Sequence, residues 1–427
     1  MCNGTIMDKL ISFSIPLMLS GILQLMFNAV DIVVVGRFSG SQALAAVGST
    51  TALINVFTNL FIGISLGANV LAARYYATGK TKEMSETVHT AIALALVSGV
   101  AMAVIGVVFA RGALEIMGTP DDVIAKSTLY MRIYFCGMPF FMMYNYGAAI
   151  LRAVGDTKRP LIFLIVSGVI NAILNLFLVI GFHLDVAGVG IATVISQLVS
   201  CILVLRCLHH TESSYQLHLA KLRIRSVYLK QIFEVGVPAG IQSTVINISN
   251  AMLQSSVNSF GSIAMAGYTA SNNIFGFLYV SVNSFTQACM SFTSQNYGVK
   301  KLKRMDRVLI DCMILSVVVT LILGSSVYIF GPELLHIYSN QADVIKYGME
   351  IFSYTTVTYF LCGLMDLFPG ALRGMGYSTV PMILSIIGTV GVRIIWIYGL
   401  FPSHRSLTFL FLSYPVSCLL YTSDAAD

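Results

Sequence analysis

Long apolar stretches recur along the whole chain, and they restrict this sequence to a fold that is embedded in a membrane. The first stretch, from Leu10 to Val35, contains a single charged residue, Asp31. A helix needs about 20 apolar residues to cross a hydrocarbon core of about 30 Å. Of the 427 residues, 56% are hydrophobic and 10% are charged, whereas soluble proteins carry about 25% charged residues. The sequence therefore predicts an all-α polytopic membrane protein.

Twelve apolar segments are long enough to be spans, and we interpret the first as a retained span because it exceeds the apolar core of a signal peptide. They form an N-lobe at 9–208 and a C-lobe at 228–417, joined by a polar linker at 209–227. We expect helices at 9–36, 46–78, 86–110, 122–152, 158–182, 186–208, 228–258, 263–297, 305–330, 344–374, 378–402 and from about 405.

The loops between these segments differ in charge on the two sides of the membrane. One side holds most of the basic residues, and cytoplasmic loops carry an excess of lysine and arginine. We therefore place the N-terminus and the linker in the cytoplasm of a cell-membrane protein. The net charge of +6 follows from these loops, so we expect no nucleic-acid partner. The basic side includes Lys9, Arg74, Lys80, Lys82, Arg152, Lys158, Arg159, Arg223, Arg225, Lys300, Lys301, Lys303, Arg304, Arg307 and Arg373.

The two halves of the chain repeat one another. The stretch "TGKTKEM" at 78–84 aligns with "VKKLKRM" at 299–305, and "LRAVGDTKRP" at 151–160 aligns with "LRGMGYSTVP" at 372–381, both at an offset of 221 residues. Each half has six spans, so the repeats share one orientation and form two pseudo-symmetric six-helix bundles. Parallel repeats of this kind are found in secondary transporters.

The end of the chain interrupts this pattern. The repeat predicts a twelfth span at 405–429, but the sequence ends in "CLLYTSDAAD". This ending resembles the translation of a sequencing adapter. We therefore expect residues 418–427 to be a non-native tail and the last helix to be incomplete.

No catalytic motif is visible in the sequence. We find no HExxH or P-loop, so we expect neither an enzyme nor a cofactor, and any pumping must use an ion gradient. The eight cysteines have no paired spacing, so we expect no disulfide. The stretch "GISLG" at 63–67 has two glycines four residues apart, a pattern typical of helix packing in membranes.

Asp31 is the most informative residue of the N-lobe. An ionised aspartate deep in a span costs about 2.5–3.5 kcal/mol on insertion scales, and such residues usually mark ion or proton pathways. Asp31 is five residues from Gly36, about 7.5 Å of helix. The alternative is therefore an acid that reaches the outer interface.

Four further polar residues are expected near Asp31. Gln24 precedes it by two helical turns, Asn171 and Asn175 share one face of the fifth span, and Thr193 enters the sixth span from the same side. Carboxylate, amide and hydroxyl oxygens suit either a hard cation such as Na⁺ or a protonatable acid. The alternative for each residue alone is a hydrogen bond between helices.

The C-lobe carries its own deep acid. Asp366 lies in the tenth span, and its repeat partner at the offset of 221 is Asn145. Arg393 lies inside the eleventh span, and it either pairs with Asp366 or has a separate role in substrate binding. The Met- and aromatic-rich stretch at 134–146 either lines an adaptable apolar cavity or packs in the core.

These stretches together resemble the multidrug and toxic compound extrusion (MATE) family. The resemblance covers 9–417 in the family's order, through "SIPLMLSGILQLMFNAVDIVVVGRFSG", "GANVLAARYYATGKTKEM", "ILRAVGDTKRP", "DVAGVGIATVISQ" and "GALRGMGYSTVP". It implies a V-shaped pair of six-helix lobes that exports amphipathic, often cationic compounds in exchange for H⁺ or Na⁺.

The resemblance also implies roles for individual residues. Asp31, with Gln24, falls on the family's first-helix acid and amide, and Asn171 and Thr193 fall on the other positions of the N-lobe cation site. Asn175 departs, because many members have aspartate there. Asp366 falls on the tenth-helix acid of a subgroup with a C-lobe site. That subgroup's seventh-helix glutamate is absent, and Gln242 is the nearest polar residue.

The expected function is therefore export of drugs and toxic organic cations by a monomer in contact with the lipid bilayer. The coupling ion is H⁺ or Na⁺, with Asp31, Asn171, Asn175 and Thr193 as the residues suited to Na⁺. A flippase of lipid-linked saccharides is the alternative within the same superfamily, and a channel or a non-transporting membrane protein is the alternative from another class.

Overall fold

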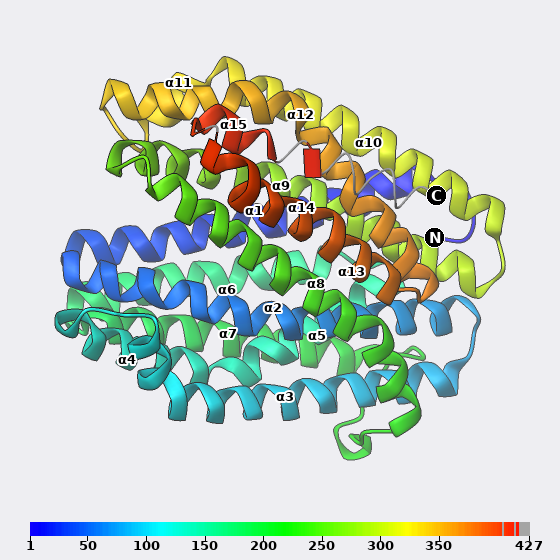
Figure 1. Ribbon diagram of the computed structural model, residues 1–427. Coiled ribbons are helices and arrows are strands. Elements are labelled where there is room, and N and C mark those ends of the chain that lie inside the picture. Colours follow the sequence, from blue (N-terminus) through cyan, green and yellow to red (C-terminus); the bar gives the residue numbers. More distant parts are fainter. Residues whose placement is uncertain (404, 414–415, 418–427) are drawn as a thin grey trace. The chain divides into compact units, whose positions relative to one another are not determined.

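The computed structural model describes residues 1–403, 405–413 and 416–417, and its regular elements in these ranges are helices (Figure 1). The expected tail at 418–427 and part of the twelfth span lie outside the described residues. The elements of the first half are α1 (Met7–Phe38), α2 (Ser41–Ala77), α3 (Thr81–Ile116), α4 (Asp121–Cys136), α5 (Met138–Val154), α6 (Lys158–Leu176), the π-helical turn η1 (Phe177–Gly181) and α7 (Asp185–His210).

The second half repeats this succession of long helices. After the short η2 (Leu219–Lys221) follow α8 (Ser226–Asn258), α9 (Ser262–Gly298), α10 (Leu302–Ile329), α11 (Gly331–His336), α12 (Ala342–Met375), α13 (Thr379–Ser385), η3 (Ile386–Gly391), α14 (Val392–Ile395), η4 (Trp396–Leu400), η5 (Phe401–Ser403) and α15 (Leu407–Phe411). Each predicted span from 9–36 to 378–402 is therefore helical. The predicted span 122–152 consists of two helices, because the chain breaks at Gly137 ahead of Pro139.

Within the described residues, seven helices are long and apolar enough to cross a membrane by length and composition. An eighth qualifies if the two parts of α12, which are bent by 53° relative to each other, are counted as one span. The helices α8 and α9 have the predicted length but carry more polar residues.

The chain divides into two compact units whose boundaries lie inside helices. Unit 2 comprises Leu19–Gly240, and unit 1 comprises Met1–Met18 together with the chain from Ile241 onward. One boundary is close to Pro16 in α1 and the other is close to Pro238 in α8. The start of α1 therefore packs with the helices of the second half, whereas the linker and the start of α8 pack with those of the first.

The linker is fixed to the rest of unit 2 by specific contacts. Leu217 is fully buried, and its carbonyl oxygen is bonded to His209 Nδ1. The backbone N–H of His218 donates to Nε2 of His89 over 3.1 Å, and the two imidazole rings stack. Arg223 and Arg225 both pair with Glu86 of α3. The linker is thus an ordered part of unit 2.

The contact between α2 and α8 in unit 2 depends on glycine. A Cβ atom at Gly67 would lie 2.1 Å from the carbonyl oxygen of Ile232, and one at Gly63 would lie 2.3 Å from Cα of Gly240. The backbones of the two helices therefore touch directly. This confirms helix packing as the role of the "GISLG" stretch.

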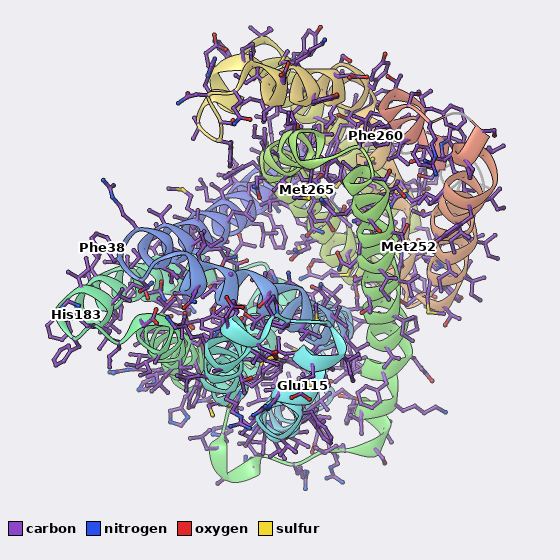
Figure 2. All side chains as sticks on the ribbon, turned by 60° about the vertical axis from the view of Figure 1, so that its left-hand side comes forward. Phe38, Glu115, His183, Met252, Phe260 and Met265 are labelled. Carbon is purple, nitrogen blue, oxygen red and sulfur yellow. The ribbon has the colours of Figure 1, made fainter. Side chains whose placement is uncertain are left out.

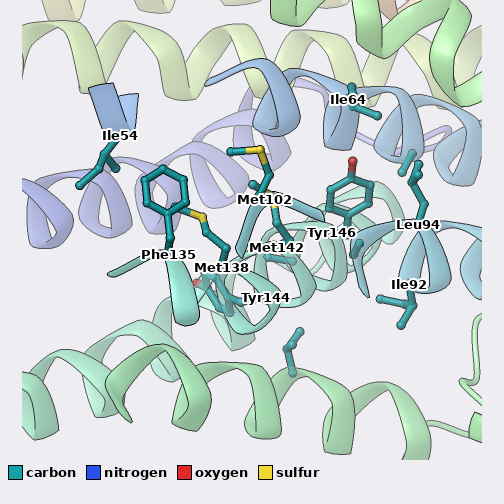
Figure 3. Close-up of a cluster of buried hydrophobic side chains, with 14 of the residues drawn as sticks. Ile54, Ile64, Ile92, Leu94, Met102, Phe135, Met138, Met142, Tyr144 and Tyr146 are labelled. Carbon is teal, nitrogen blue, oxygen red and sulfur yellow. The ribbon is translucent and has the colours of Figure 1, made fainter. Parts of the chain in front are cut away.

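The core of unit 2 includes much of the Met- and aromatic-rich stretch (Figure 3). Phe135, Met138, Met142 and Tyr146 are fully buried. These four side chains belong to the core, which favours packing over cavity lining for them. In unit 1, Phe13 at the start of α1 packs edge to face against Phe292 of α9, with ring centroids 5.5 Å apart.

Candidate functional site

A cluster of polar side chains in unit 2 joins α1 to α6. Asn175 Nδ2 donates hydrogen bonds to Asp31 Oδ1 and to Asn171 Oδ1, the latter over 3.1 Å. Asn171 is 5% exposed and Asn175 is fully buried. The structure therefore brings three of the five residues expected in the N-lobe site into one hydrogen-bonded chain.

Local sequence explains this arrangement. Asn171 and Asn175 are four residues apart, so they occupy one face of α6. One turn before Asn171, a Cβ at Gly168 would lie 1.9 Å from the ring of Phe27, so only glycine allows α1 to approach α6 this closely. Phe27 and Asp31 are also four residues apart, which directs Asp31 toward Asn175. The π-helical turn η1 follows directly, and such turns are frequent at functional sites.

Two tyrosines of α4 complete the surroundings of Asp31. Tyr130 and Tyr134 both interact electrostatically with the Asp31 carboxylate, and Tyr134 lies beside Gln197 of α7. Sequence reasoning included Tyr134 only in an apolar stretch and missed Tyr130. The available signal was their spacing of four residues, which places both phenols on one face of a helix.

The cluster contains one acidic side chain, Asp31, and one amide oxygen that accepts no hydrogen bond within the described residues, Asn175 Oδ1. None of the described lysine, arginine or histidine side chains pairs with Asp31. Asn175 Oδ1 is buried and accepts no hydrogen bond from a described group. Burial of a carboxylate without a basic partner disfavours its charged form, so a bound proton or cation would remove that cost. Such a donor set suits H⁺ or a hard cation such as Na⁺.

Gln24 and Thr193 lie apart from the hydrogen-bonded chain. Gln24 is exposed on α1, and the Thr193 hydroxyl donates to the carbonyl oxygen of Val189 in its own helix over 2.9 Å. Neither side chain has a hydrogen bond to Asp31, Asn171 or Asn175 within the described part of the chain. Their roles in ion binding therefore stay predictions.

The candidate residues of unit 1 form two separate groups. Gln242 donates to the hydroxyl of Ser385 and accepts from Arg373, and Asp366 interacts electrostatically with Arg373 and with Tyr279. Arg373 therefore connects the expected acid to the expected amide, a link that sequence reasoning missed.

Arg393 belongs to the second group. It is 5% exposed and donates to Asn250 Oδ1 over 2.7 Å and to the Ser249 hydroxyl over 3.4 Å. Among the ion pairs of the described residues there is none between Asp366 and Arg393. The contacts favour separate roles for these two residues. Asn145, the repeat partner of Asp366, bonds to the carbonyl oxygen of Phe141 in its own helix.

Comparison with known proteins identifies relatives along nearly the whole chain. The chain is 29% identical to "Probable multidrug resistance protein YoeA" of Bacillus subtilis over 90% of this chain and 84% of that protein. It is 23% identical to "Multidrug export protein MepA" of Staphylococcus saprophyticus, over 93% of this chain and 89% of that protein.

The fold also has solved counterparts. A structure described as the outward-facing conformation of a multidrug resistance MATE family transporter of the MOP superfamily matches with a TM-score of 0.91 at 19% identity, over 99% of this chain and 94% of that one. This confirms the predicted twelve-span class of fold. The family model MatE matches residues 16–177 and 238–398, which correspond to the two halves of the repeat. The chain therefore belongs to the MatE family of multidrug and toxic compound extrusion transporters.

Proposed function

We propose that this transporter is a secondary active antiporter that exports amphipathic, cationic drugs and toxic organic compounds in exchange for H⁺ or Na⁺. The observation that carries the proposal is the Asp31 carboxylate, bonded to the amide of Asn175 with no described basic partner. The relatives named as multidrug resistance and export proteins support the class of substrate.

The proposed mechanism uses the change of charge at Asp31. In the outward-open state the carboxylate takes up the ion and becomes neutral, the cluster of unit 2 closes around it, and the drug leaves. The neutral transporter returns to the inward-facing state and releases the ion. A ligand shifts such an equilibrium only by its different affinity for the two states, and an acid that is neutral in one state and ionised in the other provides that difference.

Asn175 gives this site a particular character. As an amide it donates a hydrogen bond to Asp31, which a second ionised carboxylate could not do. Asp31 is then the single titratable group of its hydrogen-bonded chain. For Na⁺, the oxygens of Asp31, Asn171 and Asn175 would hold the ion.

The proposal also includes the oligomeric state of the transporter and its place in the cell membrane. We expect a monomer in the cell membrane, with its N-terminus in the cytoplasm and lipid around it, that acts neither as an enzyme nor on nucleic acid. It needs no bound cofactor, because the ion gradient supplies the free energy.

The test is efflux of a fluorescent cationic dye from proteoliposomes under separately imposed pH and Na⁺ gradients. One of the gradients should drive efflux by the wild type, and Asp31→Asn, of the same size but without charge, should lower the rate by at least about tenfold, equivalent to about 1.4 kcal/mol. The matched control is Asp306→Asn, an exposed acid near the start of α10. Normal gradient-driven efflux by Asp31→Asn would contradict the proposal.

A further inference from the structure

Three successive contacts join α4 to α7 beside the Asp31 cluster. Lys126, Tyr130 and Tyr134 are spaced by four residues on one face of α4. Lys126 pairs with Asp185 over 2.6 Å. A Cβ at Gly190 would lie 3.6 Å from the ring of Tyr130. Tyr134 lies beside Gln197. The two helices therefore run side by side in the same direction, and the two tyrosines are the ones that interact with Asp31.

The ion pair is the outermost of the three contacts. We call the end of unit 2 with the connections 39–40, 117–120 and 182–184 its outer end, because the loop charges predict that it faces outside. Phe38 and His183, at this end, are labelled in Figure 2. Lys126 precedes Tyr130 by one turn, about 6 Å of helix rise toward the outer end. Lys126 is therefore nearer to that end than Tyr130, which interacts with Asp31.

The backbone around Asp185 adopts an unusual conformation. Asp185 and His183 both have φ of 53°, a left-handed conformation that is uncommon outside glycine. Such conformations cost free energy and cluster at functional sites. Asp185 Oδ2 contacts Lys126, while its Oδ1 is buried and has no hydrogen bond to a described group. The side chains of Lys126 and Asp185 are 35% and 33% exposed.

We propose that the Lys126–Asp185 ion pair is an electrostatic gate at the outer entrance of the Asp31 site and sets its affinity for the coupling cation. This inference rests on the proposed function. In the pair, the charge of Lys126 is compensated by Asp185, so an entering cation meets a neutral entrance. If Asp185 loses its charge, Lys126 repels the cation. If Lys126 loses its charge, Asp185 attracts it.

The two single variants should therefore act in opposite directions. A unit charge one to two helical turns from a partly buried site changes ion affinity by roughly 3- to 10-fold. Asp185→Asn should raise the ion concentration for half-maximal efflux by that factor, and Lys126→Gln should lower it. The double variant should return close to the wild type. Asparagine suits position 185, because it tolerates the left-handed conformation.

A purely structural ion pair would behave differently. Removal of either partner would then leave ion affinity unchanged or weaken it in both variants, and the double variant would not restore it. The matched control is Arg111→Gln, which breaks the exposed Arg111–Glu115 pair on α3 at the same outer end. If the coupling ion is H⁺, other ionisable groups at this end also contribute to the charge at the entrance. These groups are Asp121, Asp122, Glu115 and His183.

The experiment measures dye efflux from proteoliposomes against the concentration of the ion that drives the wild type, with thermal unfolding of each purified variant as the check on folding. Opposite shifts of the two single variants with recovery in the double variant support the gate. Shifts in the same direction, or no shift, while the wild type is ion-driven and Asp31→Asn is inactive, overturn the gate alone. A wild type without ion-driven efflux overturns both the gate and the proposed function.

Discussion

The two units surround their deep acids in opposite ways. In unit 2, Asp31 is bonded to an amide, and no described base pairs with it. In unit 1, Asp366 interacts with Arg373, which also donates to Gln242, and Arg393 is a buried arginine of the same unit. The repeat therefore does not preserve the surroundings of the acids in the two units. The proposed role of Asp31 in ion coupling rests on this difference, because a bound ion would there neutralise an acid with which no described base pairs.

The helix contacts of the two units differ as well. The largest predicted effect is the loss of stability caused by Gly67→Val in unit 2. A Cβ at Gly67 meets the carbonyl oxygen of Ile232, so α2 and α8 would have to separate. Overpacking a tight core costs about 1–3 kcal/mol, and occasionally more. We expect the folded fraction to fall sharply, measured by size-exclusion chromatography after heating.

The counterpart of Gly67 at the offset of 221 is Ala288 of unit 1, which already has a Cβ and is fully buried. Ala288→Gly should lower stability by only about 1 kcal/mol. An equal loss of folded protein in both variants would remove the distinction between a backbone contact in unit 2 and a side-chain contact in unit 1.

Asn175→Asp should have the next largest effect, because it adds a second acid to the site of unit 2. Two carboxylates in contact hold a proton or a cation more tightly than one. The ion concentration for half-maximal efflux should fall by about tenfold, corresponding to about 1.4 kcal/mol. Asn145→Asp, which adds an acid at the repeat partner of Asp366, is the control and should leave this concentration unchanged. An unchanged ion dependence in Asn175→Asp would exclude contact of the bound ion with residue 175.

The smallest predicted effect is a pH dependence in the stability of the linker. Partial burial and the nearby Lys221 hold the pKa of His218 below its usual value, which is about 6.5. The folded linker thus favours the neutral ring. Stability that is present above about pH 6.5 is lost as the pH falls below that value toward the lower pKa of the folded state, because the unfolded linker binds the proton first.

Hydrogen exchange at 211–225, corrected for intrinsic rates, should therefore be faster at pH 5.5 than at pH 7.5, because the folded linker is less stable at the lower pH. His218→Gln should abolish the difference. The inner connection of unit 1 at 299–301 contains no histidine and should exchange alike at both values. A wild-type linker that is insensitive to pH would show that His218 does not contribute to its attachment.

The sequence predicted the spans well because the length of an apolar stretch can be seen from neighbouring residues alone. It also predicted the Asp31, Asn171 and Asn175 chain, because depth and helical spacing both follow from position along a span. It did not predict that the unit boundaries lie inside α1 and α8, since that depends on contacts between distant segments such as Phe13 with Phe292.

The same reason explains what was missed in the site. Tyr130 comes near Asp31 only through the packing of α4. Arg373, on the same helix as Asp366, donates to Gln242 of α8. Sequence left open whether Arg393 pairs with Asp366 or has a separate role, because depth in the membrane does not specify which face of a helix points to which neighbour.

The most direct measurement of the central claim is the ion flux that accompanies drug transport, followed in proteoliposomes for Asp31→Asn and Asp366→Asn. If the coupling charge resides in unit 2, Asp366→Asn still moves ions when the drug is added, even if its apparent drug affinity changes. Asp31→Asn moves none. Drug-dependent ion flux that persists in Asp31→Asn and disappears in Asp366→Asn would place the coupling charge in unit 1 and contradict the account.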